Sequence, residues 1–190
     1  MNEWARALMF FLSCVFTDNV VFTRALGGEA LLGASDNLKS AARLGMATAV
    51  VMLISSMLGW AAYHLALTPL GMSYLAAPAN VVLISLVVWA VGALAPESAR
   101  LRPALPFMYV NSAILGTALI NLGAGYDLLY SALSGLFGGV GFFVAIALLA
   151  EIRERLSKSD VPAGMRGLPI GIVMTGLMSM AFLGLSGIIR

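Results

Sequence analysis

Long apolar runs separated by short polar connections dominate the pattern of this chain. Six runs are long enough for an α-helix to cross a bilayer, which takes about 20 predominantly apolar residues. They cover approximately residues 4–22, 41–66, 74–94, 104–122, 128–150 and 168–189. The pattern therefore predicts an all-α membrane protein with six transmembrane helices, built as a single integral membrane domain over residues 1–190.

Polar residues interrupt two of these runs, one in each half of the chain. Asp18 and Asn19 lie near the end of the first run, and Asn111 begins a polar pair in the fourth, which also contains Thr117. Interrupted apolar segments at corresponding places in two halves point to the binding site of duplicated transport proteins. We predict that the first and fourth spans are broken or re-entrant. Asp18, Asn19, Asn111 and Thr117 would line an ion pathway there, with the two asparagines approaching each other across a pseudo-two-fold axis.

Asp18 has two interpretations, because it is the one acidic residue well inside a predicted span. Ionisable groups at membrane depth are costly and usually face a cavity or a partner. In the first interpretation Asp18 lies beside a cation path. In the second the span ends early, and Asp18 caps a re-entrant segment at the interface. Arg24 becomes an ion-pair partner of Asp18 if the backbone breaks between them.

The composition agrees with a membrane protein and excludes several other classes. The chain is 61% hydrophobic and 11% charged, with a mean hydropathy of +0.96, whereas soluble domains carry about 25% charged residues. A net charge of +2 gives no reason to expect a nucleic-acid partner. The one cysteine, Cys14, cannot form an internal disulfide or a multi-thiolate metal site by itself. The motifs of nucleotide-binding and zinc sites are absent from the sequence.

The distribution of basic residues predicts the orientation in the membrane. Nine of them fall in the connections after the first, third and fifth spans: Arg24, Lys39, Arg43, Arg100, Arg102, Arg153, Arg155, Lys158 and Arg166. The other side has only Arg6 and Arg190. By the positive-inside rule these connections are cytoplasmic and both termini lie outside. Three spans per half then give two inverted three-helix repeats, at about residues 1–95 and 100–190.

Small residues recur along the last two spans. They are Gly135, Gly138, Gly139 and Gly141 in the fifth span and Gly171, Gly176, Gly184 and Gly187 in the sixth. Small residues let helix backbones approach closely in lipid. Ordinary packing within a helix bundle accounts for them.

Several ordered segments carry a resemblance to a known family. They are residues 18–21, 26–27, 33–35, 111–121, 152–156, 160–162, 166–167 and 176–182. Together, over essentially the whole chain, they resemble the Rnf/Nqr family of membrane subunits. Within this family the chain is most similar to the A subunits of Rnf-type ion-translocating electron-transport complexes, the counterparts of the E subunit of sodium-translocating NADH:quinone reductase.

The resemblance also exposes one departure from the family's pattern. Such family members supply two cysteines, one per repeat, to a [2Fe-2S] cluster that they share with a paralogous subunit of opposite orientation. In this chain Glu29 and Ser112 occupy those two positions, and Ala30 replaces the proline of the motif. Because such clusters are held mainly by thiolates, we expect no cofactor and no metal ligand in this chain.

The expected function follows from the resemblance. The chain would be a membrane subunit of an Rnf/Nqr-like complex that couples electron transfer to ion translocation in the bacterial cytoplasmic (inner) membrane, without iron–sulfur ligands of its own. It would have no catalytic residues and be non-catalytic alone. Its expected partners are the paralogous inverted-topology membrane subunit, other Rnf/Nqr-like subunits and the lipid bilayer. The alternatives are a repurposed paralogue that acts as a dimeric carrier or channel without redox chemistry, and a purely structural subunit.

Overall fold

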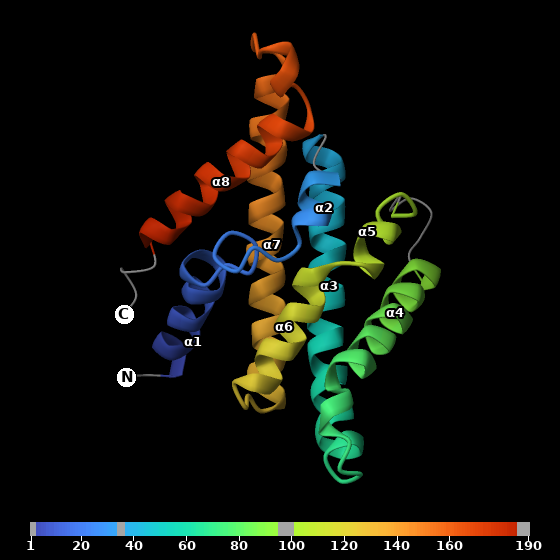
Figure 1. The fold of residues 1–190 in the computed structure, drawn as a ribbon. Helices are drawn as coiled ribbons and strands as arrows, with labels where there is room; N and C mark the ends of the chain where they lie inside the picture. Colours follow the sequence, from blue (N-terminus) through green and yellow to red (C-terminus); the bar gives the residue numbers. More distant parts are fainter. Residues whose placement is uncertain (1–2, 34–36, 95–100, 186–190) are drawn as a thin grey trace.

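A computed structural model describes residues 3–33, 37–94 and 101–185 (Figure 1), and every regular element within these ranges is helical. The main helices are α1 (Glu3–Leu12), α2 (Gly28–Gly33), α3 (Leu38–Ala62), α4 (Ala76–Leu94), α5 (Leu105–Tyr109), α6 (Ser112–Gly123), α7 (Leu128–Ser157) and α8 (Leu168–Leu185). Shorter turns are the π-helical Ser13–Thr17 and Tyr63–Leu67, which continue α1 and α3, and the 3-10 turns Ser73–Leu75 and Ala163–Met165. Arg100, Gly187, Arg190 and the motif residues Ala34 and Ser35 lie outside the described residues.

The membrane spans agree with the predicted pattern except at the first run. Five helical stretches of the described residues are long and apolar enough to cross a membrane: Leu38–Leu67, Ser73–Leu94, Leu105–Gly123, Leu128–Ser157 and Leu168–Leu185. The first predicted span, residues 4–22, instead contains a shorter apolar helix, Trp4–Thr17. Irregular backbone follows that helix, because the side chain of Asn19 takes up backbone N–H groups that a continuing helix would have used.

The two longest helices, α3 and α7, form the centre of the bundle (Figure 1). They run antiparallel and pack through glycines. A Cβ atom at Gly139 would lie 2.5 Å from the Cα of Ala49, and one at Gly45 would lie 2.8 Å from the ring of Phe143. The packing role expected for Gly139 is therefore confirmed. In α8, by contrast, an added Cβ at Gly176 would meet no atom within 4 Å.

Polar side chains at the helix starts fix where these two long helices begin. The side-chain oxygen of Asn37 accepts a hydrogen bond from the backbone N–H of Ser40 at 2.8 Å, which caps α3. Asp127 caps α7 in the same way through the N–H of Tyr130, also at 2.8 Å. Such caps satisfy N–H groups that the first helical turn leaves without partners.

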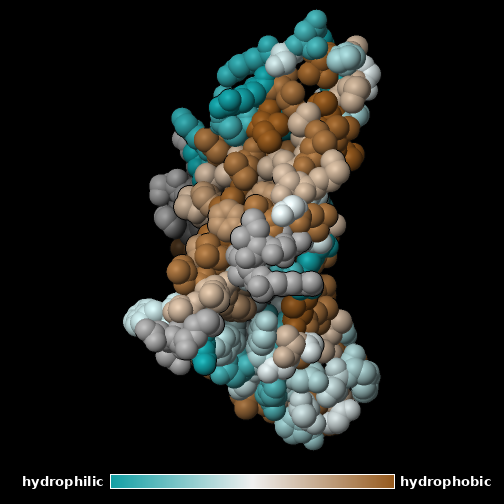
Figure 2. Space-filling view, turned by 90° about the vertical axis from the view of Figure 1, so that its left-hand side faces the viewer, coloured by the Kyte–Doolittle hydropathy of each residue, from teal (hydrophilic) through white to brown (hydrophobic). Residues whose placement is uncertain are grey.

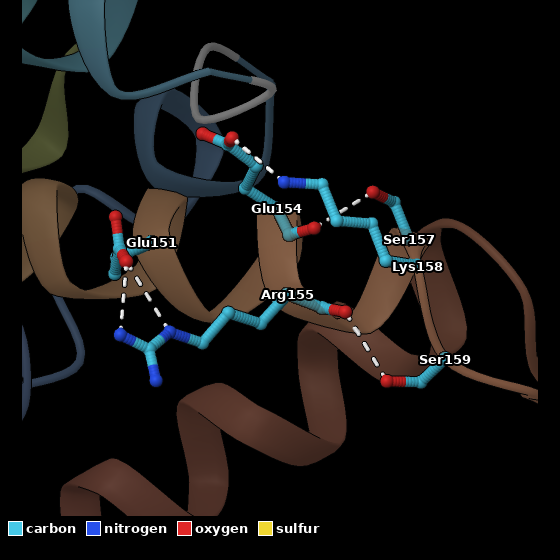
Figure 3. Close-up of polar contacts among 6 residues, drawn as sticks. All are labelled: Glu151, Glu154, Arg155, Ser157, Lys158 and Ser159. Carbon is cyan, nitrogen blue, oxygen red and sulfur yellow. Dashed lines mark hydrogen bonds and ion pairs between the residues drawn. The ribbon is translucent and has the colours of Figure 1, made fainter.

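The last turns of α7 carry ion pairs at helical spacing (Figure 3). Arg155 lies 3.2 Å from Glu151, and Lys158 lies 3.3 Å from Glu154. Pairs four residues apart support an exposed helix by a few tenths of a kcal/mol each. The apolar part of α7 therefore ends near Ala150, and a charged extension continues from it.

Apolar side chains cover the outside of the bundle. Figure 2 shows hydrophobic residues across the middle of one face, with hydrophilic residues gathered toward its upper and lower ends. On α4 the exposed side chains include Val82 and Trp89, and on α8 they include Ile172, Leu177 and Met180. Such exposed apolar faces suit helices that contact lipid or another membrane protein.

Candidate functional site

The backbone break after Thr17 is organised by Asn19, which is fully buried. Its Nδ2 donates to the carbonyl of Val15 at 2.7 Å and to the carbonyl of Gly141 on α7 at 3.1 Å. Its Oδ1 accepts from the backbone N–H groups of Val21 at 2.9 Å and Phe22 at 3.2 Å. Both donors and both lone pairs of the amide are therefore used within the protein. The side chain ties the irregular segment to the centre of α7.

Two glycines make this close approach possible. A Cβ atom at Gly141 would lie 2.9 Å from the carbonyl oxygen of Cys14 and 3.1 Å from Nδ2 of Asn19. Gly27 has a φ of 78°, and a Cβ there would lie 2.8 Å from the ring of Phe142. A larger residue would be strained at Gly27 both by the backbone conformation and by the lack of space. The irregular segment therefore reaches α2 through a position that requires glycine.

The second break lies between α5 and α6, where Asn111 is the N-cap of α6. Its Oδ1 accepts a hydrogen bond from the backbone N–H of Ala113 at 3.0 Å. Its Nδ2 is buried and has no hydrogen-bond partner. The fourth predicted span is thus interrupted next to Asn111, where the helical backbone stops at Tyr109 and resumes at Ser112.

The two broken segments meet through Glu29 and Ser112. The carboxylate of Glu29 accepts from the backbone N–H of Ser112 at 2.5 Å and from its Oγ at 3.1 Å. The same Oγ accepts from the backbone N–H of Gly27 at 2.8 Å. A carboxylate at the start of α6 is stabilised by the unpaired N–H groups and by the positive end of the helix dipole. Glu29 and Ser112, which lie 83 residues apart in the chain, therefore cap the junction together.

Asp18 and Thr117 line a separate cavity of about 150 Å³ between the first helix, α6 and α7. Arg24 and Ser134 also line it. Arg24 lies 3.2 Å from the carboxylate of Asp18, so the ion pair expected on a break between these residues is confirmed. The Asp18 side chain remains 57% exposed. The cavity thus contains one carboxylate that is accessible from outside the protein.

The structure places the four predicted pathway residues in three different surroundings. Asp18 and Thr117 share the cavity, whereas Asn111 lies at the Glu29–Ser112 junction, where its Oδ1 is 3.3 Å from a Cβ added at Gly27. Asn19 bonds to α7, and the side-chain hydrogen bonds between the two broken segments are made by Glu29 and Ser112.

Ser134 is a cavity residue that was not predicted from the sequence. It lies four residues before Gly138, which also lines the cavity. Residues four apart share one face of a helix, so this spacing could have indicated that both face the same space.

The Glu29–Ser112 junction does not fit the [2Fe-2S] cluster that the resemblance suggests. A carboxylate and a hydroxyl are hard oxygen donors, whereas these clusters are held mainly by thiolates. Both side chains are also committed to hydrogen bonds with each other and with the helix start. Among the described residues, no three histidine, cysteine or acidic side chains come together as a metal site. The single cysteine, Cys14, lies elsewhere, in the lining of the cavity that also contains Asp18 and Thr117.

Comparison with known proteins identifies the family. Residues 7–189 match the family described as "Rnf-Nqr subunit, membrane protein". The chain belongs to the Rnf-Nqr family. It is 38% identical over 188 residues to the A subunit of the ion-translocating oxidoreductase complex of Serratia proteamaculans (strain 568), covering 96% of this chain and 97% of that protein. It is 36% identical over 195 residues to the protein of the same name from Pectobacterium carotovorum subsp. carotovorum (strain PC1), covering 100% of both. The predicted resemblance is confirmed.

Proposed function

We propose that this protein is a membrane subunit of an ion-translocating oxidoreductase complex in a bacterial cytoplasmic membrane, where electron transfer is coupled to ion movement. The observation that carries the proposal is the full-length similarity to bacterial proteins that are named as the A subunits of such complexes. The apolar helices support a location in the membrane. The chain contributes scaffold and pathway residues and is non-catalytic alone.

The position of Glu29 supports a protein partner at the junction. Gly27, two residues before it, packs against Phe142, near the centre of the apolar part of α7. Glu29 is exposed in the isolated chain. A carboxylate exposed to lipid at that depth is costly, so another protein chain or a polar cavity has to cover it. We assign this surface to the paralogous membrane subunit.

Three features support inverted repeats. Residues 28–33 read GEALLG, and residues 111–116 read NSAILG, so Glu29 and Ser112 occupy matching places. From their junction α2 and α6 run in opposite directions (Figure 1). The following helices, α3 and α7, are antiparallel. Two halves of opposite orientation around a central site are typical of ion-coupled membrane transporters.

The pathway residues take different roles in this proposal. Asp18, with the hydroxyl of Thr117 nearby in the cavity, is the group that attracts a cation. Arg24 neutralises Asp18 when no cation is present, which lowers the cost of the charge at membrane depth. Asn19 and Asn111 are positioning residues, since one holds the first break against α7 and the other caps α6.

The proposal is tested in inverted membrane vesicles from a strain that lacks this chain. Reduced electron donor should drive ion uptake in vesicles from the parent strain, and uptake should be lost in the deletion strain and restored by the chain supplied in trans. A deletion strain that retains donor-driven uptake and coupled electron transfer would show that the protein is not part of the complex.

A carrier without redox chemistry is the second candidate, and the Glu29–Ser112 junction is the observation that favours it. Oxygen donors stand where the family's cluster cysteines are expected. In that case the purified protein, with its partner, transports an ion in proteoliposomes in the absence of any electron donor. Donor-dependent transport would instead support the oxidoreductase complex. Iron and acid-labile sulfide that disappear on Glu29→Ala or Ser112→Ala substitution would contradict the absence of a cluster from this chain.

A further inference from the structure

A pocket of about 450 Å³ lies between the end of α7 and the start of α8. This volume is in the usual range for sites that bind small ligands. Two arginines line the pocket, Arg153 from α7 and Arg166 from the connection that leads to α8. The pocket shares no lining residue with the cavity of Asp18 and Thr117. It is therefore a second candidate site, which the proposed ion pathway does not use.

The charges in the lining favour an anion. Arg153 and Arg166 contribute two positive charges, and none of the described residues that form the walls is acidic. The negative end of the α7 dipole and the positive end of the α8 dipole meet at this pocket, so their effects oppose each other. The guanidinium charges therefore decide the electrostatic character of the site.

Arg166 is held in place and still has donors for a ligand. Its Nε donates to the carbonyl of Val161 at 2.8 Å. A guanidinium has five N–H donors, and the others of Arg166 form no hydrogen bond within the part of the chain that the structure describes. Its ion-pair partner Asp160 is 3.8 Å away, and the side chain of Asp160 is fully exposed. Such a pair is weak because water screens it.

The hydroxyl groups in the lining are used to finish α7. Oγ of Ser157 donates to the carbonyl of Glu154 at 2.8 Å, and Oγ of Ser159 donates to the carbonyl of Arg155 at 3.2 Å (Figure 3). Both bonds satisfy carbonyl groups of the last turn, which would otherwise repel an anion. The N–H groups of Arg166 remain for a ligand, and guanidinium groups bind phosphate oxygens through two parallel hydrogen bonds.

The pocket lies at the depth of lipid phosphates. Arg153 is three residues beyond Ala150, where the apolar part of α7 ends, and this spacing corresponds to about 4.5 Å along the helix. The headgroup layer on each side of the hydrocarbon core is about 5–7 Å thick. Leu156, Val161 and Ile170 also line the pocket. These apolar side chains suit the glycerol and first carbons of a lipid, which a free anion lacks.

We propose that this pocket binds the phosphate group of an anionic phospholipid, with Arg166 as the main ligand and Arg153 as a second positive charge. The basic connections are predicted to be cytoplasmic, and the cytoplasmic leaflet carries anionic lipids. Nη1 of Arg153 also donates to the carbonyl of Leu32 in α2 at 2.9 Å. A headgroup in the pocket would therefore stabilise the packing of α2, α7 and α8 together.

Thermal unfolding of the purified full-length chain in a neutral detergent tests the site. Phosphatidylglycerol, phosphatidylcholine or inorganic phosphate is added at equal concentration and constant ionic strength. We expect phosphatidylglycerol to raise the Tm by about 3 °C or more above phosphatidylcholine, since a ligand that binds only the folded state stabilises it. Inorganic phosphate should give a smaller increment because it makes no apolar contacts. An equal increment with inorganic phosphate would assign the pocket to a free anion and overturn the lipid.

Arg166→Gln should lose most of the increment that phosphatidylglycerol gives. Arg155→Gln is the matched control and should keep it, because Arg155 is an exposed arginine at the same end of α7 that does not line the pocket. Each variant removes one positive charge. An equal loss in both would show only a general attraction of anionic lipid to the basic end of the protein, and it would overturn the site. Equal Tm values in the two lipids would do the same.

The Tm in phosphatidylcholine alone checks the folding of Arg166→Gln. The substitution removes one exposed hydrogen bond and a weak ion pair, so this Tm should fall by no more than about 4 °C. Native mass spectrometry gives a second measurement, in which the parent and Arg155→Gln should retain more phosphatidylglycerol than Arg166→Gln. Equal retention would contradict the site. Neither measurement uses an electron donor, so failure of the lipid site and failure of the proposed function are distinguishable.

Discussion

The carboxylate of Glu29 caps helix α6 by accepting hydrogen bonds from both the backbone N–H and the hydroxyl of Ser112, at 2.5 and 3.1 Å. Ser112 in turn accepts from the N–H of Gly27 before α2. One acidic side chain thus links the two interrupted segments of the chain. The family resemblance leads one to expect a cysteine thiolate at each of these two positions. In this chain the two positions are joined by hydrogen bonds instead.

Glu29→Ala should destabilise the protein, because the backbone N–H and the hydroxyl of Ser112 lose their acceptor at the start of α6, where only the Asn111 cap remains. Loss of a cap of this kind costs about 1–2 kcal/mol, which for a chain of this size lowers the Tm by about 2–8 °C. Glu29→Gln, which keeps an acceptor oxygen, should fall between Ala and the parent. Thermal unfolding in detergent measures the effect. Glu154→Ala, which removes an exposed ion pair on α7, is the control, and an equal shift there would contradict the capping role.

Asp18→Asn should impair ion transport while leaving stability nearly unchanged. The ion pair with Arg24 is partly exposed, and such pairs contribute about 0–1 kcal/mol. The cavity would lose its carboxylate, and we expect the rate of ion uptake by vesicles to fall about tenfold, which corresponds to roughly 1.4 kcal/mol. Asp160→Asn, in an exposed pair with Arg166, should transport normally. Normal uptake by the Asp18 variant would remove Asp18 from the pathway.

Gly139→Ala should separate α3 from α7, since the new Cβ would lie 2.5 Å from the Cα of Ala49. Overpacking in a tight interface costs about 1–3 kcal/mol. Gly176→Ala introduces the same methyl group on α8, where no atom lies within 4 Å, and it should be neutral or slightly stabilising. The two Tm values compare the sites directly. A Gly139 variant as stable as the Gly176 variant would show that the helices have room to move.

Orientation in the membrane is tested by labelling single cysteines in a Cys14→Ala background. Lys39→Cys and Lys158→Cys lie at the start of α3 and just beyond α7, which are at the same end of the antiparallel pair. We expect an impermeant maleimide to reach them only from the cytoplasmic side, in agreement with the basic bias. Asp127→Cys, at the opposite end of α7, should be labelled from outside in intact cells. The reverse pattern would invert the predicted topology.

The positions of the spans and the family could be predicted from the order of residues along the chain. Helices in lipid need long apolar runs and internally bonded backbones, so local composition determines where they form. The Asp18–Arg24 pair was also predictable, because its members are six residues apart and only the break between them was uncertain. The first span was predicted too long, since its apolar residues continue past Thr17 while its hydrogen bonding does not.

The tertiary structure alone decided which polar groups meet. Asn19 could have faced an ion, but packing of the first break against Gly141 commits its amide to the backbone. Glu29 and Ser112 are 83 residues apart, and only the opposed starts of α2 and α6 bring them together. Periodicity along one segment carries no information about which residue of a distant segment lies opposite. That choice depends on how the glycines of α7 let neighbouring segments approach, which becomes defined only when the whole bundle is packed.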